Sequence, residues 1–251
     1  MDYQQYADTL QVIKGFCAKS DGKDKLTALV QYLCLYLSAG QPGNLKKVQA
    51  SVTAARKIFR IMRPLETLTG LLTQPGFTGK QPMHQEALAK LKDLLMATYF
   101  SADHVVWAYQ IGLIADKKTG ERAQKVSLWS WALGSVLTMI IEANAILSVS
   151  SRRLASESDA EWAKRQEAAR QEINGRLLVF IHGGLQALTA AGLLQLYPFK
   201  PRTVGLLGTL ASALNCYFLL PPFPKRAAPA AKPALAAANS AAEGKLVAKV
   251  A

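Results

Sequence analysis

Two long stretches near the C-terminal end of the chain contain no Asp, Glu, Lys or Arg. They cover residues 177–199 and 203–224, and only the short sequence "KPR" separates them. A helix needs roughly 20 mainly apolar residues to cross the hydrocarbon core of a bilayer. Both stretches reach this length, so the sequence predicts an all-α, helical integral membrane protein whose C-terminal region forms a membrane helical hairpin.

Two further apolar segments each contain one carboxylate. In residues 126–151, ten Leu, Ile, Phe and Val residues contribute roughly −3 to −6 kcal/mol to insertion, against about +2.5 to +3.5 kcal/mol for a central Glu142. In residues 94–114 the apolar side chains likewise favour insertion while a carboxylate, Asp103, opposes it. Spanning the membrane, lying at its surface and packing within the protein all stay open for these segments.

The chain divides by composition into three regions. Residues 1–125 are predicted to form an N-terminal helical region that includes a basic amphipathic helix at 45–63, since no alternating strand pattern occurs. Residues 126–224 form the membrane-associated helical region. The tail at 225–251 is rich in Ala, Pro and Lys and is predicted to be disordered.

Local signals place two more helices. A long helix is expected from about His84 to Ile114, because Pro and Gly residues mark a loop directly before it. A charged helix is expected between the apolar segments, where Ser158 and Glu161 have the spacing of a capping box.

The chain carries a formal charge of +13 and has a pI near 9.7. Such an excess favours an anionic partner, and the apolar segments make an anionic phospholipid membrane the first candidate. Nucleic acid is not expected as a partner, because no recognition motif accompanies the cations. Cys17, Cys34 and Cys216 match no metal or redox spacing, which predicts buried free thiols in a reducing compartment.

The stretch "TAARKIFRIMRPL" (residues 53–65) combines four cations with large apolar residues before a proline. On a continuous helix the cations fall within an arc of about 120°, and the apolar residues lie opposite. The cations are Arg56, Lys57, Arg60 and Arg63, and the apolar residues are Ile58, Phe59, Ile61, Met62 and Leu65. Since no acid lies between Lys46 and Arg63, residues 56–63 are predicted to bind an anionic membrane. The alternative is an ordinary domain helix with a solvated basic face.

The electrostatic attraction between these cations and an anionic membrane is too weak to bind the helix by itself. Four cations near an anionic surface contribute about 1 kcal/mol each, which alone corresponds to roughly millimolar affinity. The apolar face must therefore insert into one leaflet, and a helix that wedges one leaflet bends the bilayer.

Small residues recur at every fourth position in the two uncharged stretches. They are Gly183, Ala187 and Ala191 in the first, and Gly208 and Ser212 in the second. This spacing allows helices to approach closely in lipid, as in a tight hairpin or a self-associating face. The alternative is that membrane helices are simply rich in small residues.

An enzymatic activity is not expected. His84, His104 and His182 are scattered, and the sequence contains no HExxH pattern, phosphate-binding loop or GxSxG elbow. We expect neither a cofactor nor a metal ion.

Four stretches of the chain match a known family: "DGKDKLTALVQYLCLYLS", "ARKIFRIMRPL", "YFSADHVVWAYQIGL" and "AAGLLQLYPFKPRTVGLLGTLASALNCYFLLP". In these stretches the chain resembles the peroxin-11 family of peroxisomal membrane proteins, which elongate and proliferate peroxisomes. These stretches are spread over nearly the whole chain except the tail. The "GQPG" turn and the C-terminal "GLLQL" stretch are most similar to the plant and algal members.

The resemblance implies a multi-pass peroxisomal membrane protein with both termini in the cytosol. It also implies membrane remodelling by an amphipathic helix, which corresponds to residues 45–63, together with homo-oligomerisation. A fission adaptor and a dynamin-like GTPase are implied as partners in peroxisome fission. The tail departs from the family's C-terminal dilysine signal, because it has only the isolated Lys245 and Lys249 near its end.

A channel for small metabolites in the peroxisomal membrane is the alternative function. Asp103 and Glu142 are candidate intramembrane polar residues, and a carboxylate within the membrane is functional by default. The competing interpretation of both residues is an ion pair within a helical bundle or a position at the membrane surface.

Overall fold

The computed structural model describes residues 3–149 and 158–222. These residues form α-helices and no strand, so the predicted all-α class is confirmed. The helices are α1 (Tyr3–Ala18), α2 (Ser20–Ser38), α3 (Asn44–Phe59), α4 (Arg63–Thr73), α5 (Met83–Gln110), α6 (Lys117–Ser148), α7 (Asp159–Leu193) and α8 (Pro201–Leu219). The predicted disordered tail, residues 225–251, lies outside the described residues.

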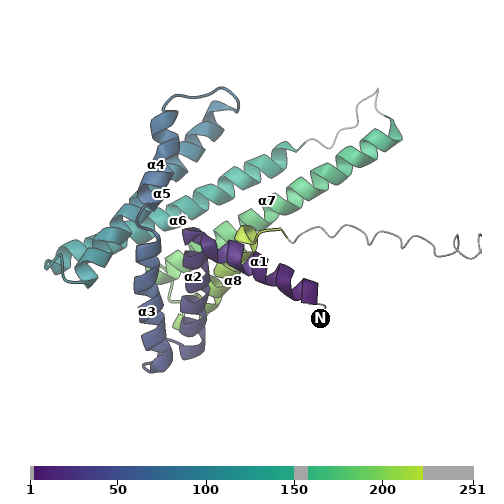
Figure 1. Cartoon of the computed structure of the whole chain (residues 1–251). Coiled ribbons are helices and arrows are strands. Elements are labelled where there is room, and N and C mark those ends of the chain that lie inside the picture. The colour runs from purple at the N-terminus through teal and green to yellow at the C-terminus, as the bar shows by residue number, and fades with distance from the viewer. Residues whose placement is uncertain (1–2, 150–157, 223–251) are drawn as a thin grey trace, which may run out of the picture. The chain divides into compact units, whose positions relative to one another are not determined.

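The chain divides into two compact units. The larger unit extends over residues 15–220, and the described part of the smaller unit consists of residues 3–14 and 221–222. Within the larger unit the helix contacts close a ring, in which α2 packs on α3, α3 on α5, α5 on α6, α6 on α7, α7 on α8, and α8 on α2. Figure 1 shows α6 and α7 as two long neighbouring helices of this ring. A small core of Tyr32, Leu35 and Val204 lies between α2 and α8.

The contact of α8 with α2 depends on two glycines. A Cβ atom added to Gly205 would lie 2.4 Å from the Tyr36 backbone nitrogen. A Cβ atom added to Gly208 would lie 2.2 Å from the Tyr32 ring. Only residues without a side chain allow the two helices to approach this closely.

We therefore expect Gly205→Ala to destabilise the protein by about 1–3 kcal/mol, because the new methyl group must push two backbones apart. Gly175→Ala is the matched control, since a Cβ at this helical position meets nothing within 4 Å and alanine favours helix by about 0.5–1 kcal/mol. Thermal unfolding followed by circular dichroism measures both variants. Equal melting temperatures would show that α8 does not pack on α2 as described.

The predicted amphipathic helix at 45–63 is not continuous. Helix α3 ends at Phe59, residues 60–62 form a turn, and α4 begins at Arg63. The physical reason is Pro64, whose ring clashes with the carbonyl group four residues earlier in a helix and which has no N–H to donate. That carbonyl belongs to Arg60, so the helix breaks there. We call residues 60–62 the bend.

The membrane-length helices differ from the predicted pair. Helices α6 and α7 are long and apolar enough to cross a membrane, and α6 contains most of the segment 126–151 that the sequence left open. Few residues of their most apolar parts are fully buried within the protein. Helix α6 exposes Val126, Trp129, Leu133, Val136 and Ile140 along one face, and α7 exposes Leu177, Ile181, Leu188 and Leu193. Helix α8, which holds most of the predicted span 203–224, and α5 do not meet the same criterion.

Residues 177–193 of the predicted span 177–199 are part of a longer helix, and the span's last six residues lie beyond its end. Helix α7 starts at Asp159 and ends at Leu193, so the charged helix and the apolar stretch are one element of 35 residues. The predicted capping box at its start is confirmed, because the Ser158 side chain accepts a hydrogen bond from the Glu161 N–H and the Glu161 carboxylate accepts one from the Ser158 N–H.

Candidate functional site

The bend between α3 and α4 presents apolar side chains to the outside. Ile58, Ile61 and Met62 are 55%, 56% and 55% exposed, and Leu65 is equally exposed in the first turn of α4. Phe59 is half-buried. We call Ile58, Ile61, Met62 and Leu65 the apolar bend surface. Exposed aliphatic side chains grouped in this way are typical of a surface that meets a lipid or a protein partner.

The cations of the same segment point inward. Lys57 and Arg60 are only 5% and 7% exposed, and Arg56 and Arg63 are partly buried. In this structure the cations are therefore neutralised from within the protein, whereas binding of residues 56–63 to an anionic membrane stays a prediction. The separation of charged and apolar residues is real, but the charged side faces the protein and the apolar side faces outward.

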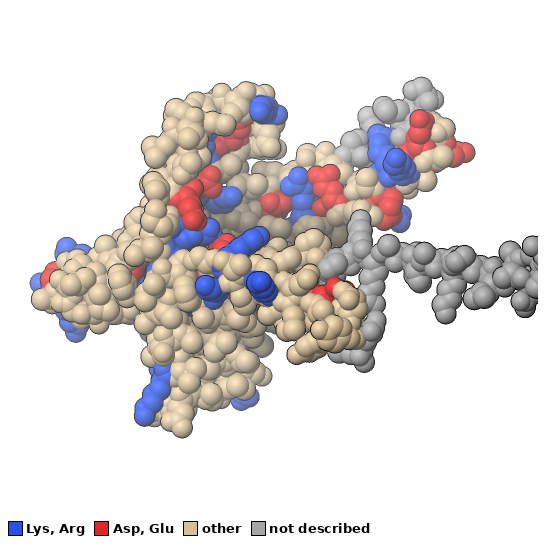
Figure 2. Space-filling model, in the orientation of Figure 1, with Lys and Arg blue, Asp and Glu red and all other residues tan. Residues whose placement is uncertain are grey.

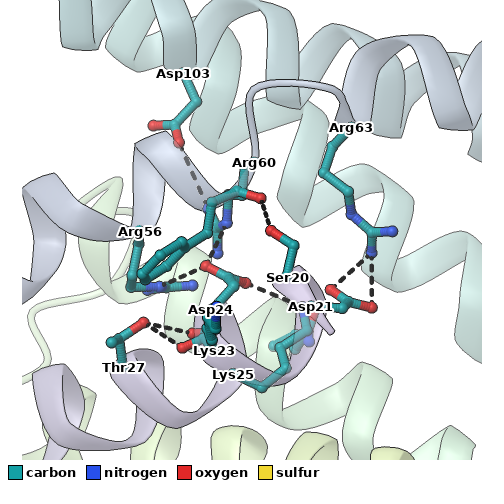
Figure 3. Close-up of polar contacts among 12 residues, drawn as sticks. Ser20, Asp21, Lys23, Asp24, Lys25, Thr27, Arg56, Arg60, Arg63 and Asp103 are labelled. Atoms are coloured by element: carbon teal, nitrogen blue, oxygen red, sulfur yellow. Dashed lines mark hydrogen bonds and ion pairs between the residues drawn. The ribbon is translucent and has the colours of Figure 1, made fainter. Parts of the chain in front are cut away.

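Asp24 of α2 pairs with two of these cations, Arg56 and Arg60 (Figure 3). Its Oδ1 atom lies 2.7 Å from Arg60 Nε and 3.1 Å from Arg56 Nε, and its Oδ2 atom lies 3.5 Å from Lys25 Nζ. Burial of Asp24 would by itself raise the pKa of its carboxyl group, but Arg60 and Arg56 outweigh burial and hold the pKa well below its usual range. Asp24 is therefore a charged carboxylate at every pH at which the protein is expected to work.

Asp103 of α5 is the second carboxylate in this group. It lies 2.6 Å from Lys57 Nζ and 3.5 Å from Arg60 Nη1, and the same Nη1 atom donates a hydrogen bond of 2.6 Å to the Tyr99 hydroxyl. Arg60, the first residue of the bend, thus contacts both α2 and α5. We call Asp24, Lys25, Arg56, Lys57, Arg60 and Asp103 the inner charge cluster.

A second, more exposed set of contacts holds the bend itself. Arg63 pairs with Asp21 at 3.0 Å and with Glu66 at 2.9 Å. Ser20 donates a hydrogen bond of 2.6 Å to the carbonyl oxygen of Phe59, the last residue of α3 (Figure 3). This contact satisfies a carbonyl group that the end of a helix leaves free. The start of α2 therefore fixes the place at which α3 stops.

Glu142 also has a partner. Its carboxylate lies 3.2 Å from Arg176 Nη1, where α6 and α7 lie side by side. Both candidate intramembrane carboxylates, Asp103 and Glu142, thus form ion pairs within the helical bundle. This is the interpretation of the two residues that competes with a role in a channel. Within the described residues no group of His, Cys, Asp and Glu side chains could hold a metal ion.

The small residues of α7 and α8 face different neighbours. Gly183 is buried, and a Cβ at this position would lie 3.0 Å from the Met139 side chain of α6. Gly208 and Ser212 are buried in α8, and Gly208 meets α2. Ala187 and Ala191 are half-buried in α7. The small residues therefore serve contacts of α7 with α6 and of α8 with α2, in addition to the hairpin of α7 and α8.

Asp21 and Asp24 are partners of the basic segment that were not predicted from the sequence. Both acids lie in "SDGKDK" at the start of α2, which is otherwise apolar on its buried side. Asp24 is only 2% exposed, and a buried carboxylate requires a partner. Two sequence features could have predicted these ion pairs. One is the pair of acids near the start of an apolar helix, and the other is the run of cations that has no acid within it.

The charged residues are unevenly distributed over the visible surface. Figure 2 shows Lys, Arg, Asp and Glu mixed over the N-terminal part of α7, whereas the lower part of the view, formed by α2 and α3, carries few charges. The apolar segments of α6 and α7 and the apolar bend surface thus give the larger unit several outward-facing surfaces that water solvates poorly.

Comparison with known proteins yields consistent matches. The family described as Peroxisomal biogenesis factor 11 (PEX11) matches residues 10–220. Peroxisomal membrane protein 11C of Arabidopsis thaliana is 33% identical over 223 residues, which are 86% of this chain and 94% of that protein. Peroxisomal membrane protein 11-1 of Oryza sativa subsp. japonica is 33% identical over 210 residues, which are 81% of this chain and 88% of that protein. No solved structure matches the chain.

Proposed function

The chain belongs to the Peroxisomal biogenesis factor 11 (PEX11) family, and from this membership we propose that it remodels and elongates the peroxisomal membrane and so promotes peroxisome proliferation and fission. It is a peroxisomal membrane protein that takes part in peroxisome biogenesis. The match over residues 10–220 carries this assignment, since it covers all the helices except part of α1 and leaves out only the ends of the chain.

The apolar bend surface is the proposed membrane-active element. Its four side chains project from a bend whose position is fixed by the inner charge cluster and by the Ser20 contact. Ion pairs within the cluster direct the cations inward, and this leaves the apolar side of the bend free to enter one leaflet. Residues 56–63 therefore act in two ways, with the cations holding the bend and the apolar residues binding lipid.

Helices α6 and α7 are the proposed membrane crossing. Their charge-free parts cover residues 126–141 and 177–193, which at 1.5 Å per residue correspond to about 24–26 Å, slightly less than the hydrocarbon thickness of about 30 Å. The Glu142–Arg176 pair then lies at one membrane surface. Two crossings place the start of α6 and the end of α7 on the same side of the membrane, which we propose is the cytosolic side.

The topology has a direct test in a variant without Cys17, Cys34 and Cys216. Lys117→Cys at the start of α6 and Ala160→Cys at the start of α7 lie at opposite ends of the pair. We expect an impermeant maleimide to label Lys117→Cys on intact peroxisomes and Ala160→Cys only after permeabilisation. Labelling of both positions on intact organelles would contradict the crossing.

Homo-oligomerisation and recruitment of a fission adaptor and a dynamin-like GTPase complete the proposal. They follow from the family membership, and the outward-facing apolar surfaces of α6 and α7 support self-association in the bilayer. The proposed function is tested by reconstituting the full chain into anionic liposomes of uniform size. We expect tubules that grow in number with the ratio of protein to lipid. Liposomes that incorporate the protein and stay spherical at every ratio would contradict membrane remodelling.

A further inference from the structure

A cavity of about 320 Å³ lies inside the ring of helices. One wall carries Lys25, Arg56 and Arg60, which belong to the inner charge cluster. The facing residues on α7 and α8 include Gln186 and Asn215, which are polar and uncharged. The Gln186 amide is already bonded to Trp131 and His182, so Asn215 is the group that can donate and accept hydrogen bonds in a cavity lined by these cations.

The inner charge cluster contains more positive than negative charge. Four cations, Lys25, Arg56, Lys57 and Arg60, share the two carboxylates of Asp24 and Asp103. Two positive charges are left over in a group whose members are buried or partly buried. Removing unbalanced charges from water is costly.

The other cations around the cavity do not add to this excess. Arg63 has Asp21 and Glu66 as partners, and Lys92 has Asp93. The unbalanced charge therefore belongs to the wall formed by Lys25, Arg56 and Arg60. An anion in the cavity would neutralise it.

Lys25 has hydrogen-bond donors available for such an anion. Its ammonium group offers three donors, and its one ion pair, with Asp24, is long at 3.5 Å. No hydrogen bond from Lys25 Nζ occurs among the described residues, although the side chain lines the cavity. Burial lowers the pKa of Lys25, against the opposing effect of Asp24, and an anion beside it would favour its charged form.

We propose that this cavity binds a phosphate group, carried either by a phospholipid headgroup or by a small soluble ligand. The two surplus positive charges match a phosphate, which carries one to two negative charges, and arginine and lysine are the side chains that bind phosphate most often. The volume lies at the lower end of the range of about 300–1,000 Å³ for ligand sites. It therefore accommodates a headgroup or a small phosphorylated molecule, and the acyl chains of a lipid would stay outside.

The test measures thermal unfolding of the full chain in neutral detergent at constant ionic strength. Inorganic phosphate is titrated in one arm, with chloride as the exchanged ion, and phosphatidic acid is added to the micelles in the other, with phosphatidylcholine as the reference. A ligand that binds only the folded protein raises the melting temperature as its concentration rises. A response to inorganic phosphate identifies a soluble source, and a response to phosphatidic acid alone identifies a lipid. No response in either arm would overturn the proposal.

Lys25→Gln and Lys23→Gln form the matched pair of variants. Both remove one positive charge from α2, but Lys23 is exposed and does not line the cavity. We expect Lys25→Gln to weaken binding about tenfold, as the loss of one charge-assisted hydrogen bond does, and Lys23→Gln to leave it unchanged. Equal effects of the two variants would show diffuse attraction of anions to a basic protein and would overturn the site.

Asn215→Asp provides an independent variant, since it keeps the size of the side chain and adds a negative charge inside the cavity. The new carboxylate should take the place of the ligand. We expect the ligand-free variant to melt at a higher temperature than the wild type and to lose at least tenfold in affinity for the anion. A variant that binds the anion like the wild type would place the ligand elsewhere.

Discussion

Replacing Asp24 by asparagine should destabilise the protein by about 3–5 kcal/mol, the cost of removing one partner from a buried ion pair. The substitution keeps the shape of the side chain but leaves Arg56 and Arg60 without their shared carboxylate. For a chain of this size each kcal/mol lowers the melting temperature by about 2–4 °C, so a drop on the order of 10 °C is expected. Circular dichroism of the detergent-solubilised protein measures it.

The control is Glu121→Gln, which also removes one carboxylate from an ion pair. Glu121 pairs with Lys117 at 3.7 Å, and both side chains are well exposed. Exposed pairs contribute at most about 1 kcal/mol, so the melting temperature should change by only a few degrees. An Asp24→Asn variant that melts as Glu121→Gln does would contradict the inner charge cluster.

The contribution of Asp24 to the free energy of unfolding should decrease as the pH falls. Its pKa is held below the ordinary value of 3.8 by Arg60 and Arg56. A carboxyl group whose pKa is lowered by folding contributes all of its stability above the pKa of the unfolded chain and loses it as the pH falls towards the folded pKa. The difference in stability between wild type and Asp24→Asn should therefore be constant from pH 7 to about pH 5 and should shrink below 3.8.

The second large effect is expected from the apolar bend surface. A variant with Ile58→Ser, Ile61→Ser and Met62→Ser should fold like the wild type but lose the ability to form tubules from liposomes. Transfer of the exposed part of each side chain from water into lipid is worth about 1 kcal/mol, so the three together weaken insertion of the bend roughly 100-fold. Electron microscopy of reconstituted liposomes counts the tubules formed by the wild type and by the variant. Equal incorporation of the two proteins is verified first.

A second triple variant controls for the general loss of apolar surface. Leu72, Met83 and Leu113 are exposed apolar residues outside the bend, and replacing each with serine removes a comparable surface. Tubule formation should persist in this variant. If the two triple variants behaved alike, the bend would have no special part in remodelling.

The structure also changes how charge-reversal variants must be interpreted. Glu in place of Arg56 or Arg60 would put a third carboxylate beside Asp24 and Asp103. Such a variant would lose remodelling because it fails to fold, and the loss would say nothing about contact with lipid. The serine variants avoid this difficulty because Ile58, Ile61 and Met62 have no partners inside the inner charge cluster.

The sequence predicted much of the local structure. The helical class, the helix from His84, and the Ser158–Glu161 capping box all depend on neighbouring residues, and the structure confirms them. The predicted end of the helix at residue 63 is four residues later than the end of α3 at Phe59, because the steric effect of Pro64 acts on Arg60 and not on the residue directly before the proline.

The orientation of the basic segment could not be obtained from its own residues. Periodicity shows that cations and apolar residues lie on opposite sides, but it does not show which side faces the protein. The deciding contacts come from Asp24, 32 residues before Arg56, and from Asp103, 46 residues after Lys57. Pairings across such distances depend on how the helices pack.

The same limit applies to the membrane-length helices. Glu142 counts as an unpaired charge when residues 126–151 are considered alone, and its partner Arg176 is 34 residues away. The charged helix and the span 177–199 look like separate elements by composition, yet α7 runs from the charged residues through residue 193 of that span. Hydropathy reports the composition of a segment, whereas helix continuity and ion pairs depend on its neighbours.

A double-mutant cycle between Asp24 and Arg60 tests the central claim most directly, namely that the cations of the basic segment hold the protein together from inside. It compares the unfolding free energies of wild type, Asp24→Asn, Arg60→Gln and the double variant. We predict a coupling energy of about 1–3 kcal/mol, as is typical of residues that share a buried ion pair. Additive effects, with a coupling energy near zero, would contradict the account and would return Arg60 to an outward, lipid-facing position.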